Sequence, residues 1–361
     1  MIEKVNTFIE LFFNKAQLDL RFSQWVLYFI VLFLFLNAGN AFCKDTREDW
    51  EKKSGPISLV NQAPIQLLFL QAIPDKAETL SKGQSSLCFN TAITNTLLSE
   101  KSGNYEGVVN MEMIRTSLEL QYGILSGLEI GMSLPFVYSY PGVMDHAILD
   151  FEKFFFCNTR TLREKEEPDK YEYYVKRNNK SFISGKGKRC SGMGDLVLRL
   201  KGKLWDEGDI LPCLSTRLAF KFSTGDKDRA LGSGKPDYGF GLLLQKDIKI
   251  LTFYLNADVI FPGDAYKGEN VPITEFYKVM LGAEYKVSSR FSILAQINYI
   301  TRPFKDTGLN ILDRRIYDLL LGINYLTEGG IFIQGGGIED LNNSENAGAD
   351  ITFFLNVGKN F

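Results

Sequence analysis

The sequence has little histidine and no excess of charge of either sign. Its 361 residues include one histidine, His146, so a metal site built from several histidines is excluded. Lysine and arginine number 41, and aspartate and glutamate number 43. The resulting net charge of −2 gives no reason to expect nucleic acid as a partner. We expect neither a metal nor a cofactor.

Long hydrophobic runs are also scarce. The run WVLYFIVLFLFL (25–36) is too short to span a bilayer as a helix. It follows Lys15 and Arg21 and precedes the small residues of NAGNA, which is typical of a secretory signal peptide. We therefore expect a signal peptide over 1–41, with a retained anchor as the alternative. No run of about 18 apolar residues recurs downstream, so an exported chain of this kind must cross a membrane with strands.

The remaining sequence is rich in alternation of apolar and polar residues. In IRTSLELQYG, Ile114, Leu118 and Leu120 face one way, whereas Arg115 and Glu119 face the other. The same period of two predicts strands at 86–98, 110–123, 127–139, 193–205, 212–223, 237–247, 249–262, 275–287, 290–302, 315–326, 330–338 and 350–361. Strands of about 10 residues or more suit a tilted membrane crossing, whereas those of a soluble sandwich, the alternative, run to about 5–6.

Short and long connections alternate along these strands. The long set is 99–109, 140–192, 224–236, 263–274, 303–314 and 339–349, and the intervening connections are tight turns. This is the pattern of an outer-membrane barrel. We predict an all-β fold: a single antiparallel transmembrane β-barrel of about 12 strands over 64–361, with a long extracellular loop at 140–192. Residues 42–63 are expected to be a periplasmic linker, and 64–72 a periplasmic strand, an extra barrel strand or a plug.

Several stretches resemble a family of predicted outer-membrane barrels, domain-of-unknown-function family 3187. They are RTSLELQYGILSGLEIGMSLPFVY, SGMGDLVLRLKGKL, RLAFKFSTGD, LGSGKPDYGFGLLL and LNADVIFPG. Gly194–Asp195, Ser223–Gly225 and Gly232–Gly234 are also similar to barrels linked to phenol degradation. The resemblance implies the barrel and carries no assigned activity, although the second likeness hints at a hydrophobic or aromatic solute.

The predicted inward face is densely charged. Charged side chains cannot face lipid cheaply, so the alternation places them in the lumen. They are Arg115, Glu119, Glu129, Asp195, Arg199, Lys201, Lys203, Arg217, Lys221, Asp258, Lys278, Glu284, Lys286, Arg302 and Asp318. One interpretation is a water-filled path that favours anions, and the other is an interior filled by mutual salt bridges. We predict a passive channel or uptake protein for a small solute, with a non-conducting structural or surface-interaction barrel as the alternative.

A barrel enzyme is a weaker hypothesis. His146 lies beside Asp145, with Asp150 four residues later, which is suggestive of a general base and its orienting carboxylate. No serine nucleophile follows close by, so we expect no enzyme. GSGK at 232–235 lacks the earlier glycine and the following helix of a phosphate-binding loop.

The loop 140–192 is predominantly basic and topology places it outside the cell. It is a candidate contact for lipopolysaccharide phosphates or an anionic solute, with a solvated loop as the alternative. Cys157 and Cys190 bracket its basic part. In an oxidising compartment a disulfide between them would tie the base of the loop, and the alternative is two free thiols.

The chain ends in ITFFLNVGKNF, an alternating strand with a terminal aromatic. Phe353, Leu355 and Val357 are predicted to face lipid, and Phe361 the periplasmic interface. This ending resembles the signal by which barrel-assembly machinery recognises its clients. The predicted location is therefore the outer membrane of a Gram-negative-type cell.

Overall fold

A computed structural model describes residues 55–142, 144, 170–341 and 348–361 of the chain. The predicted signal peptide and the residues His146, Asp145, Asp150 and Cys157 lie outside the described residues. Among the described residues, no helix has both the length and the apolar character to span a bilayer.

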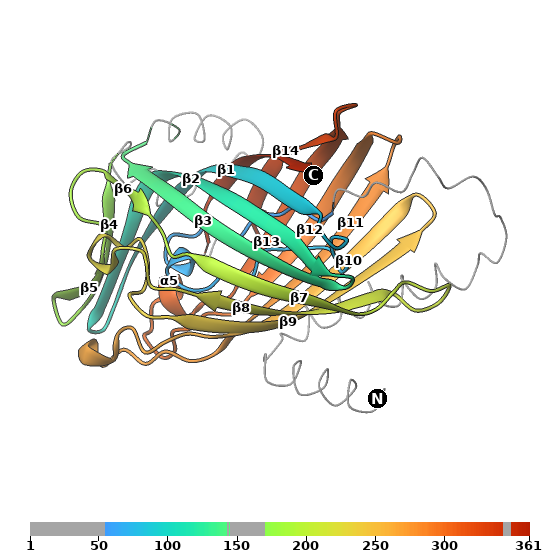
Figure 1. The fold of residues 1–361 in the computed structure, drawn as a ribbon. Coiled ribbons are helices and arrows are strands. Elements are labelled where there is room, and N and C mark those ends of the chain that lie inside the picture. The colour runs from blue at the N-terminus through green and yellow to red at the C-terminus, as the bar shows by residue number, and fades with distance from the viewer. Residues whose placement is uncertain (1–54, 143, 145–169, 342–347) are drawn as a thin grey trace. The chain divides into compact units, whose positions relative to one another are not determined.

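Twelve antiparallel strands of the described chain form a closed barrel (Figure 1). Each pairs with the next one along the wall, and the last strand closes on the first from Ser86↔Asn360 to Asn95↔Ile351. The barrel strands are β1 (Ser85–Ser102), β2 (Tyr105–Leu125), β3 (Leu128–Tyr140), β7 (Val197–Trp205), β8 (Cys213–Lys221), β9 (Asp237–Ile248), β10 (Leu251–Phe261), β11 (Phe276–Lys286), β12 (Phe291–Ile300), β13 (Ile316–Leu326), β14 (Ile331–Asp340) and β15 (Ile351–Asn360). The predicted all-β barrel is thereby confirmed.

Alternation along the strands separates an apolar outer surface from the interior. On β15, Phe353 and Leu355 are each about half exposed, whereas Thr352, Phe354 and Asn356 are buried. Successive side chains of a strand point to opposite faces, so one apolar series covers the outside of the wall. The same pattern on the other strands leaves exposed residues such as Phe136, Leu218, Ile293 and Leu321 on the outside.

Short turns lie at one rim and longer connections at the other, with one exception. The predicted loop 99–109 is strand, because β1 and β2 pair as far as Ser102↔Tyr105. The turn between them contains Gly103, whose φ is +54°. Leu98 and Val109 hold this hairpin by packing in an apolar cluster at the long-loop end. We call the two ends the short-turn rim and the long-loop rim.

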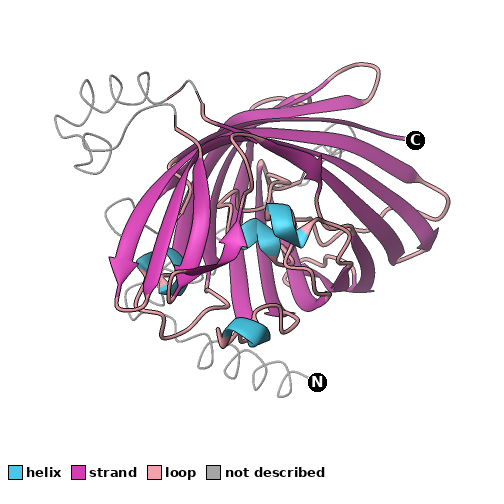
Figure 2. Cartoon of the chain, turned by 90° about the vertical axis from the view of Figure 1, so that its left-hand side faces the viewer, coloured by secondary structure: helices cyan, strands magenta, loops and turns pink. Residues whose placement is uncertain are grey.

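The predicted loop 140–192 contains three further strands, which sequence patterning missed. They are β4 (Glu172–Arg177), β5 (Lys180–Ser184) and β6 (Cys190–Met193). β4 pairs with the outer end of β2, and β6 pairs with the outer end of β3. Figure 2 shows the long-loop rim facing the viewer, with the short helices in cyan. These helices are η1 (Gln66–Leu68), η2 (Lys227–Arg229), η3 (Lys267–Glu269) and α5 (Asn310–Asp313).

Residues 55–80, which we call the interior segment, lie inside the barrel (Figure 1, blue), and the exposed residues 81–84 lead from it into β1. The first limb, 57–63, contacts the wall formed by β12–β15 and β1. The second limb, 68–80, follows η1 and contacts β3 and β7–β11. Residues 64–72, for which the sequence predicts a periplasmic strand, an extra barrel strand or a plug, form no strand and are largely buried in the interior. The described part of the range 42–63, expected to be a periplasmic linker, lies in the interior because Ile57 and Leu59 bury their side chains there.

Candidate functional site

Charged side chains of β7, β8, β10 and β11 face the second limb. We call them the charged wall: Lys201, Arg217, Lys221, Asp258 and Lys278, all of which are buried. Arg217 binds Asp258 through two bonds, from Nε to Oδ1 at 2.8 Å and from Nη2 to Oδ2 at 2.7 Å. This fork is the strong, oriented form of an arginine–carboxylate pair.

Cations of the charged wall also donate to backbone carbonyls of the second limb. Lys221 Nζ donates to Leu68 O at 2.8 Å, Lys278 Nζ donates to Ala72 O at 2.8 Å, and Arg217 donates to Ile73 O. The second limb is extended and has no sheet partner, so its buried carbonyls need hydrogen-bond donors from elsewhere. The charged wall provides those partners.

Carboxylates complete the binding of the second limb. Glu129 Oε2 accepts a hydrogen bond from Leu80 N at 2.9 Å. Lys201 Nζ lies 3.3 Å from Glu129 Oε1 and 2.8 Å from Asp75 Oδ2, so it joins the barrel wall to the limb. A buried ion pair is stable only when its remaining hydrogen-bonding groups also have partners. The carboxylates of Glu129 and Asp75 have such partners in the backbone of the limb.

The first limb is held differently, by apolar packing. Ile57 and Leu59 pack against inward residues of β1 and β12–β15, which we call the apolar wall: Ala92, Leu294, Leu320, Ile338 and Phe354. Polar contacts are fewer on this side, with Ile57 N donating to Gln296 Oε1 at 3.0 Å and Asn61 Nδ2 donating to Asp318 Oδ2 at 2.8 Å. Phe354 interrupts the inward polarity of the last strand because it meets this limb.

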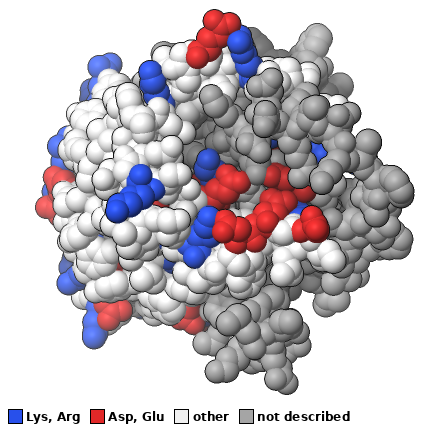
Figure 3. All heavy atoms as spheres, turned by 45° about the vertical axis from the view of Figure 1, so that its right-hand side comes forward, with Lys and Arg blue, Asp and Glu red and all other residues white. Residues whose placement is uncertain are grey.

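Aromatic residues pack together at the long-loop rim. Phe69 lies edge-on to Phe276 at 6.3 Å and to Phe304 at 5.6 Å between ring centroids. Ile311 and Leu312 of α5 belong to the same cluster. At the opposite end, Figure 3 shows acidic and basic residues gathered near the centre of the face. The two ends of the lumen therefore differ in chemistry.

Nearly all the residues predicted to line the lumen are buried. The exceptions are Arg199, which binds Glu119 at 2.9 Å, and Lys203, which pairs with exposed Asp206 at the short-turn rim. Glu284 accepts from Tyr254 Oη and from Ser292 Oγ, both at 2.6 Å. Arg302 donates from Nε to Arg314 O at 2.8 Å.

Sequence reasoning missed the partner of these charges, the interior segment. A signal was present: Leu294, Leu320 and Phe354 are apolar residues at inward positions of otherwise polar series. Inward apolar residues on adjacent strands need an apolar partner, and PISLV (56–60) provides one.

Cys157, the predicted disulfide partner of Cys190, lies outside the described residues. The thiol of Cys190 is free and buried, and Cys190 Sγ lies 3.4 Å from Arg229 O. Strand β6 directs this side chain inward rather than toward the base of an exposed loop. Cys88 and Cys213 are also free and buried.

The last residue forms part of the barrel seam. Phe361 N donates to Ser85 O at 2.8 Å, and Ser85 N donates to Phe361 O at 3.1 Å. Lys359 Nζ lies 5.6 Å from the centroid of the Phe361 ring. Phe353, Leu355, Val357 and Phe361 all have exposed side chains.

Residues 43–361 match the model of the family described as Protein of unknown function (DUF3187). The chain belongs to the DUF3187 family. Comparison with curated proteins gives no significant match.

Solved structures share the fold of this DUF3187 protein at low sequence identity. An outer membrane channel from Pseudomonas putida F1 is 13% identical, with a TM-score of 0.53 over 80% of this chain and 99% of its own. The NanC porin is 9% identical (TM-score 0.42, 76% and 98% covered), and the P. putida toluene transporter TodX is 10% identical (TM-score 0.40, 83% and 93% covered). The first likeness shows the fold alone, and the other two add nothing to it.

Proposed function

We propose that this DUF3187 protein is an outer-membrane channel for a small solute and that the interior segment restricts its lumen. The observation that carries the proposal is the way the second limb is held. Its partners are charged and polar groups of the wall, which water can solvate when the limb moves. An aqueous path is compatible with such a wall.

The outer surface supports the membrane location. Apolar residues are exposed on successive strands, and a closed barrel leaves no unpaired strand edge in lipid. The proposed surroundings are therefore outer-membrane lipid and lipopolysaccharide. The P. putida outer membrane channel has a similar fold, and this similarity is compatible with the proposed location.

Reconstitution of the full barrel in planar bilayers tests the proposal. We expect an ohmic current with a weak preference for anions, and solute-dependent swelling of liposomes that contain the protein. Folding is checked by the shift in gel mobility on heating. A folded protein that carries no current and causes no swelling would contradict the proposal.

The second candidate is a non-conducting structural barrel. The observation that favours it is the apolar packing of the first limb, because Ile57 and Leu59 fill the interior beside the apolar wall. Such a barrel would carry no current in planar bilayers and would cause no swelling of liposomes.

The exposed terminal aromatic supports a proposed role in assembly. Deleting Phe361 removes its ring and the two backbone bonds to Ser85, so we expect less folded barrel in the outer membrane. Fractionation followed by the gel mobility assay measures this amount. Replacement of Phe361 by Tyr keeps the ring and the backbone and is expected to assemble normally. Equal assembly of the deletion variant and the unmodified chain would refute the role.

A further inference from the structure

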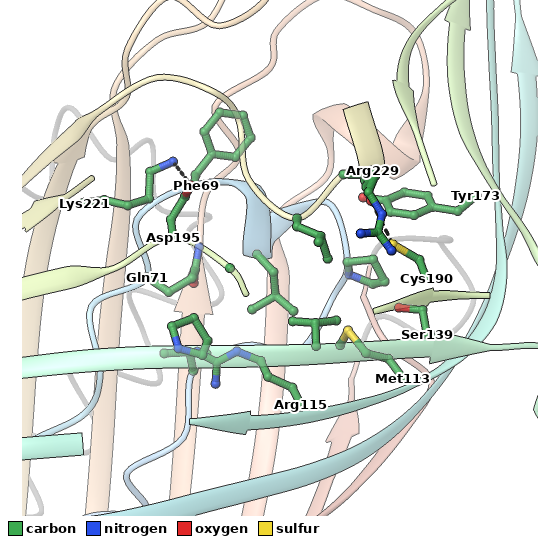
Figure 4. Close-up of a pocket in the computed structure, with 18 of the residues that line it drawn as sticks. Phe69, Gln71, Met113, Arg115, Ser139, Tyr173, Cys190, Asp195, Lys221 and Arg229 are labelled. Carbon is green, nitrogen blue, oxygen red and sulfur yellow. Dashed lines mark hydrogen bonds and ion pairs between the residues drawn. The ribbon is translucent and has the colours of Figure 1, made fainter. Parts of the chain in front are cut away.

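A cavity of about 60 Å³ lies between the interior segment and strands β2, β3 and β6 (Figure 4). Met111, Met113 and Val137 provide apolar lining, and Arg115 lines the cavity from β2. Lys221 and Asp195 also line it, but they bind each other at 2.7 Å. The cavity is partly enclosed by residues of the long-loop rim, including Tyr173 and Arg229.

Arg115 is a buried cation without a bound anion in the described part of the chain. Arg115 is 8% exposed, and none of the described residues forms a hydrogen bond or ion pair with its guanidinium. Glu119, four residues further along β2, favours the Arg115 cation through space, but its carboxylate is bound by Arg199 at 2.9 Å and by Ser133 Oγ at 2.5 Å. Burying an arginine without an anion is costly, which indicates that the cavity supplies one.

Two further donors line the same cavity and have no partner. The hydroxyls of Tyr171 and Tyr173 are buried and form no hydrogen bond with the described residues. Burial raises the pKa of Tyr171 to about 12, so its hydroxyl keeps its proton at neutral pH. Native structures leave few buried polar groups unsatisfied, so these hydroxyls make part of the cavity polar. Tyr173 pairs with Val109, six residues from Arg115 along β2, which is about 20 Å at about 3.3 Å per residue. Tyr173 therefore lies at the far end of the cavity from Arg115, and Arg115 alone marks the end that suits an anion.

The size of the cavity limits the rest of that ligand. A cavity of about 150 Å³ holds benzene, and this one is less than half as large. An aromatic ring does not fit, whereas a carboxylate with a short aliphatic chain does. The thioethers of Met111 and Met113 suit the apolar end of such a molecule.

We propose that this cavity is a binding subsite for a short-chain aliphatic monocarboxylate, with its carboxylate on Arg115 and its chain against Met113 and Val137. This inference rests on the proposed function in one respect: only if the protein is a channel is the bound carboxylate a solute that passes through it. The aromatic solute suggested by sequence resemblance does not suit this subsite.

Equilibrium binding of radiolabelled propionate to the full-length, detergent-solubilised protein tests the subsite without any need for conduction. We expect saturable binding that unlabelled propionate displaces and propionamide, its uncharged analogue, does not. Arg115→Met should weaken binding about tenfold or more, because it removes a charge-assisted hydrogen bond. Arg290→Met is the matched control, since Arg290 pairs with Glu328 at an exposed turn.

A second variant guards against misfolding of Arg115→Met. Arg115→Lys keeps the positive charge without the planar fork of donors and should weaken propionate binding by less than Arg115→Met, with the barrel intact by gel mobility. The proposal would be overturned by absent binding to the folded, unmodified protein, by equal binding to Arg115→Met, or by tighter binding of benzoate than of propionate. Binding in a protein that carries no current would support the subsite while refuting the channel, so the two failures are distinguishable.

Discussion

The two sides of the barrel interior hold the same segment of chain by opposite means. The charged wall binds the backbone of the second limb, whereas the apolar wall packs against side chains of the first limb. Bonds to backbone carbonyls depend little on which side chains the limb carries. Packing of Ile57 and Leu59 depends on their shape and volume. Substitutions in the charged wall should therefore loosen the second limb, and substitutions of Ile57 or Leu59 should loosen the first.

The largest effect is expected for Arg217→Met. This change removes the fork to Asp258 and the bond to Ile73 O, and it leaves a buried carboxylate unpaired. Breaking one partner of a buried pair costs about 3–5 kcal/mol. Denaturant unfolding of the refolded barrel, followed by tryptophan fluorescence, measures the loss. Arg290→Met is the surface control, with an expected change below about 1 kcal/mol. Equal losses in the two variants would contradict the special role of the charged wall.

Ile57→Ala should have the next largest effect, on the first limb. Ile57 is fully buried against the apolar wall, and truncation of such a side chain costs about 2–5 kcal/mol. The same unfolding assay measures it, and proteolysis near the start of the interior segment should become faster. Ile57→Val keeps most of the volume and should cost about 0.5–1.5 kcal/mol. If alanine and valine cost the same, packing does not hold this limb.

Gly241→Ala should have a smaller effect that reaches the charged wall indirectly. A Cβ at this position would collide with Asp258 Oδ1, so the carboxylate that pairs with Arg217 must shift. Overpacking of this kind costs about 1–3 kcal/mol. Gly202→Ala is the control, because nothing lies within 4 Å of the added Cβ there. Unfolding free energies that are the same for both alanine variants would refute the explanation.

Much of the barrel was predictable from the sequence, whereas the contents of its lumen were not. A period of two is a local property, so twelve strands and the side that each residue faces follow from short windows. Strands β4, β5 and β6 escaped prediction because they are short and lie in a basic loop. The partners of Lys221 and Lys278 escaped because they are backbone atoms more than 150 positions away, which leave no side-chain signal.

The candidate site shows the same limit. Alternation correctly marks Arg115 as an inward residue, yet it cannot tell an arginine with a carboxylate partner from one without. Glu119 is its neighbour on the same strand face and is the partner that alternation alone suggests. The structure binds Glu119 to Arg199 of β7 instead, and pairing across strands of this separation is not readable from one sequence.

The most direct test of the account is a lock between the interior segment and the barrel wall. Ala77 of the second limb is buried against Cys213 of β8, so Ala77→Cys brings a second thiol to the native one. Cys43, Cys88, Cys157 and Cys190 are replaced by serine, and Ala77→Ser in the same background is the control. Single-channel current is then recorded before and after reduction. We predict that the oxidised lock suppresses the current and that reduction restores it, with no change in the control. A locked channel that conducts as well as the reduced one would contradict the claim that the interior segment restricts the lumen.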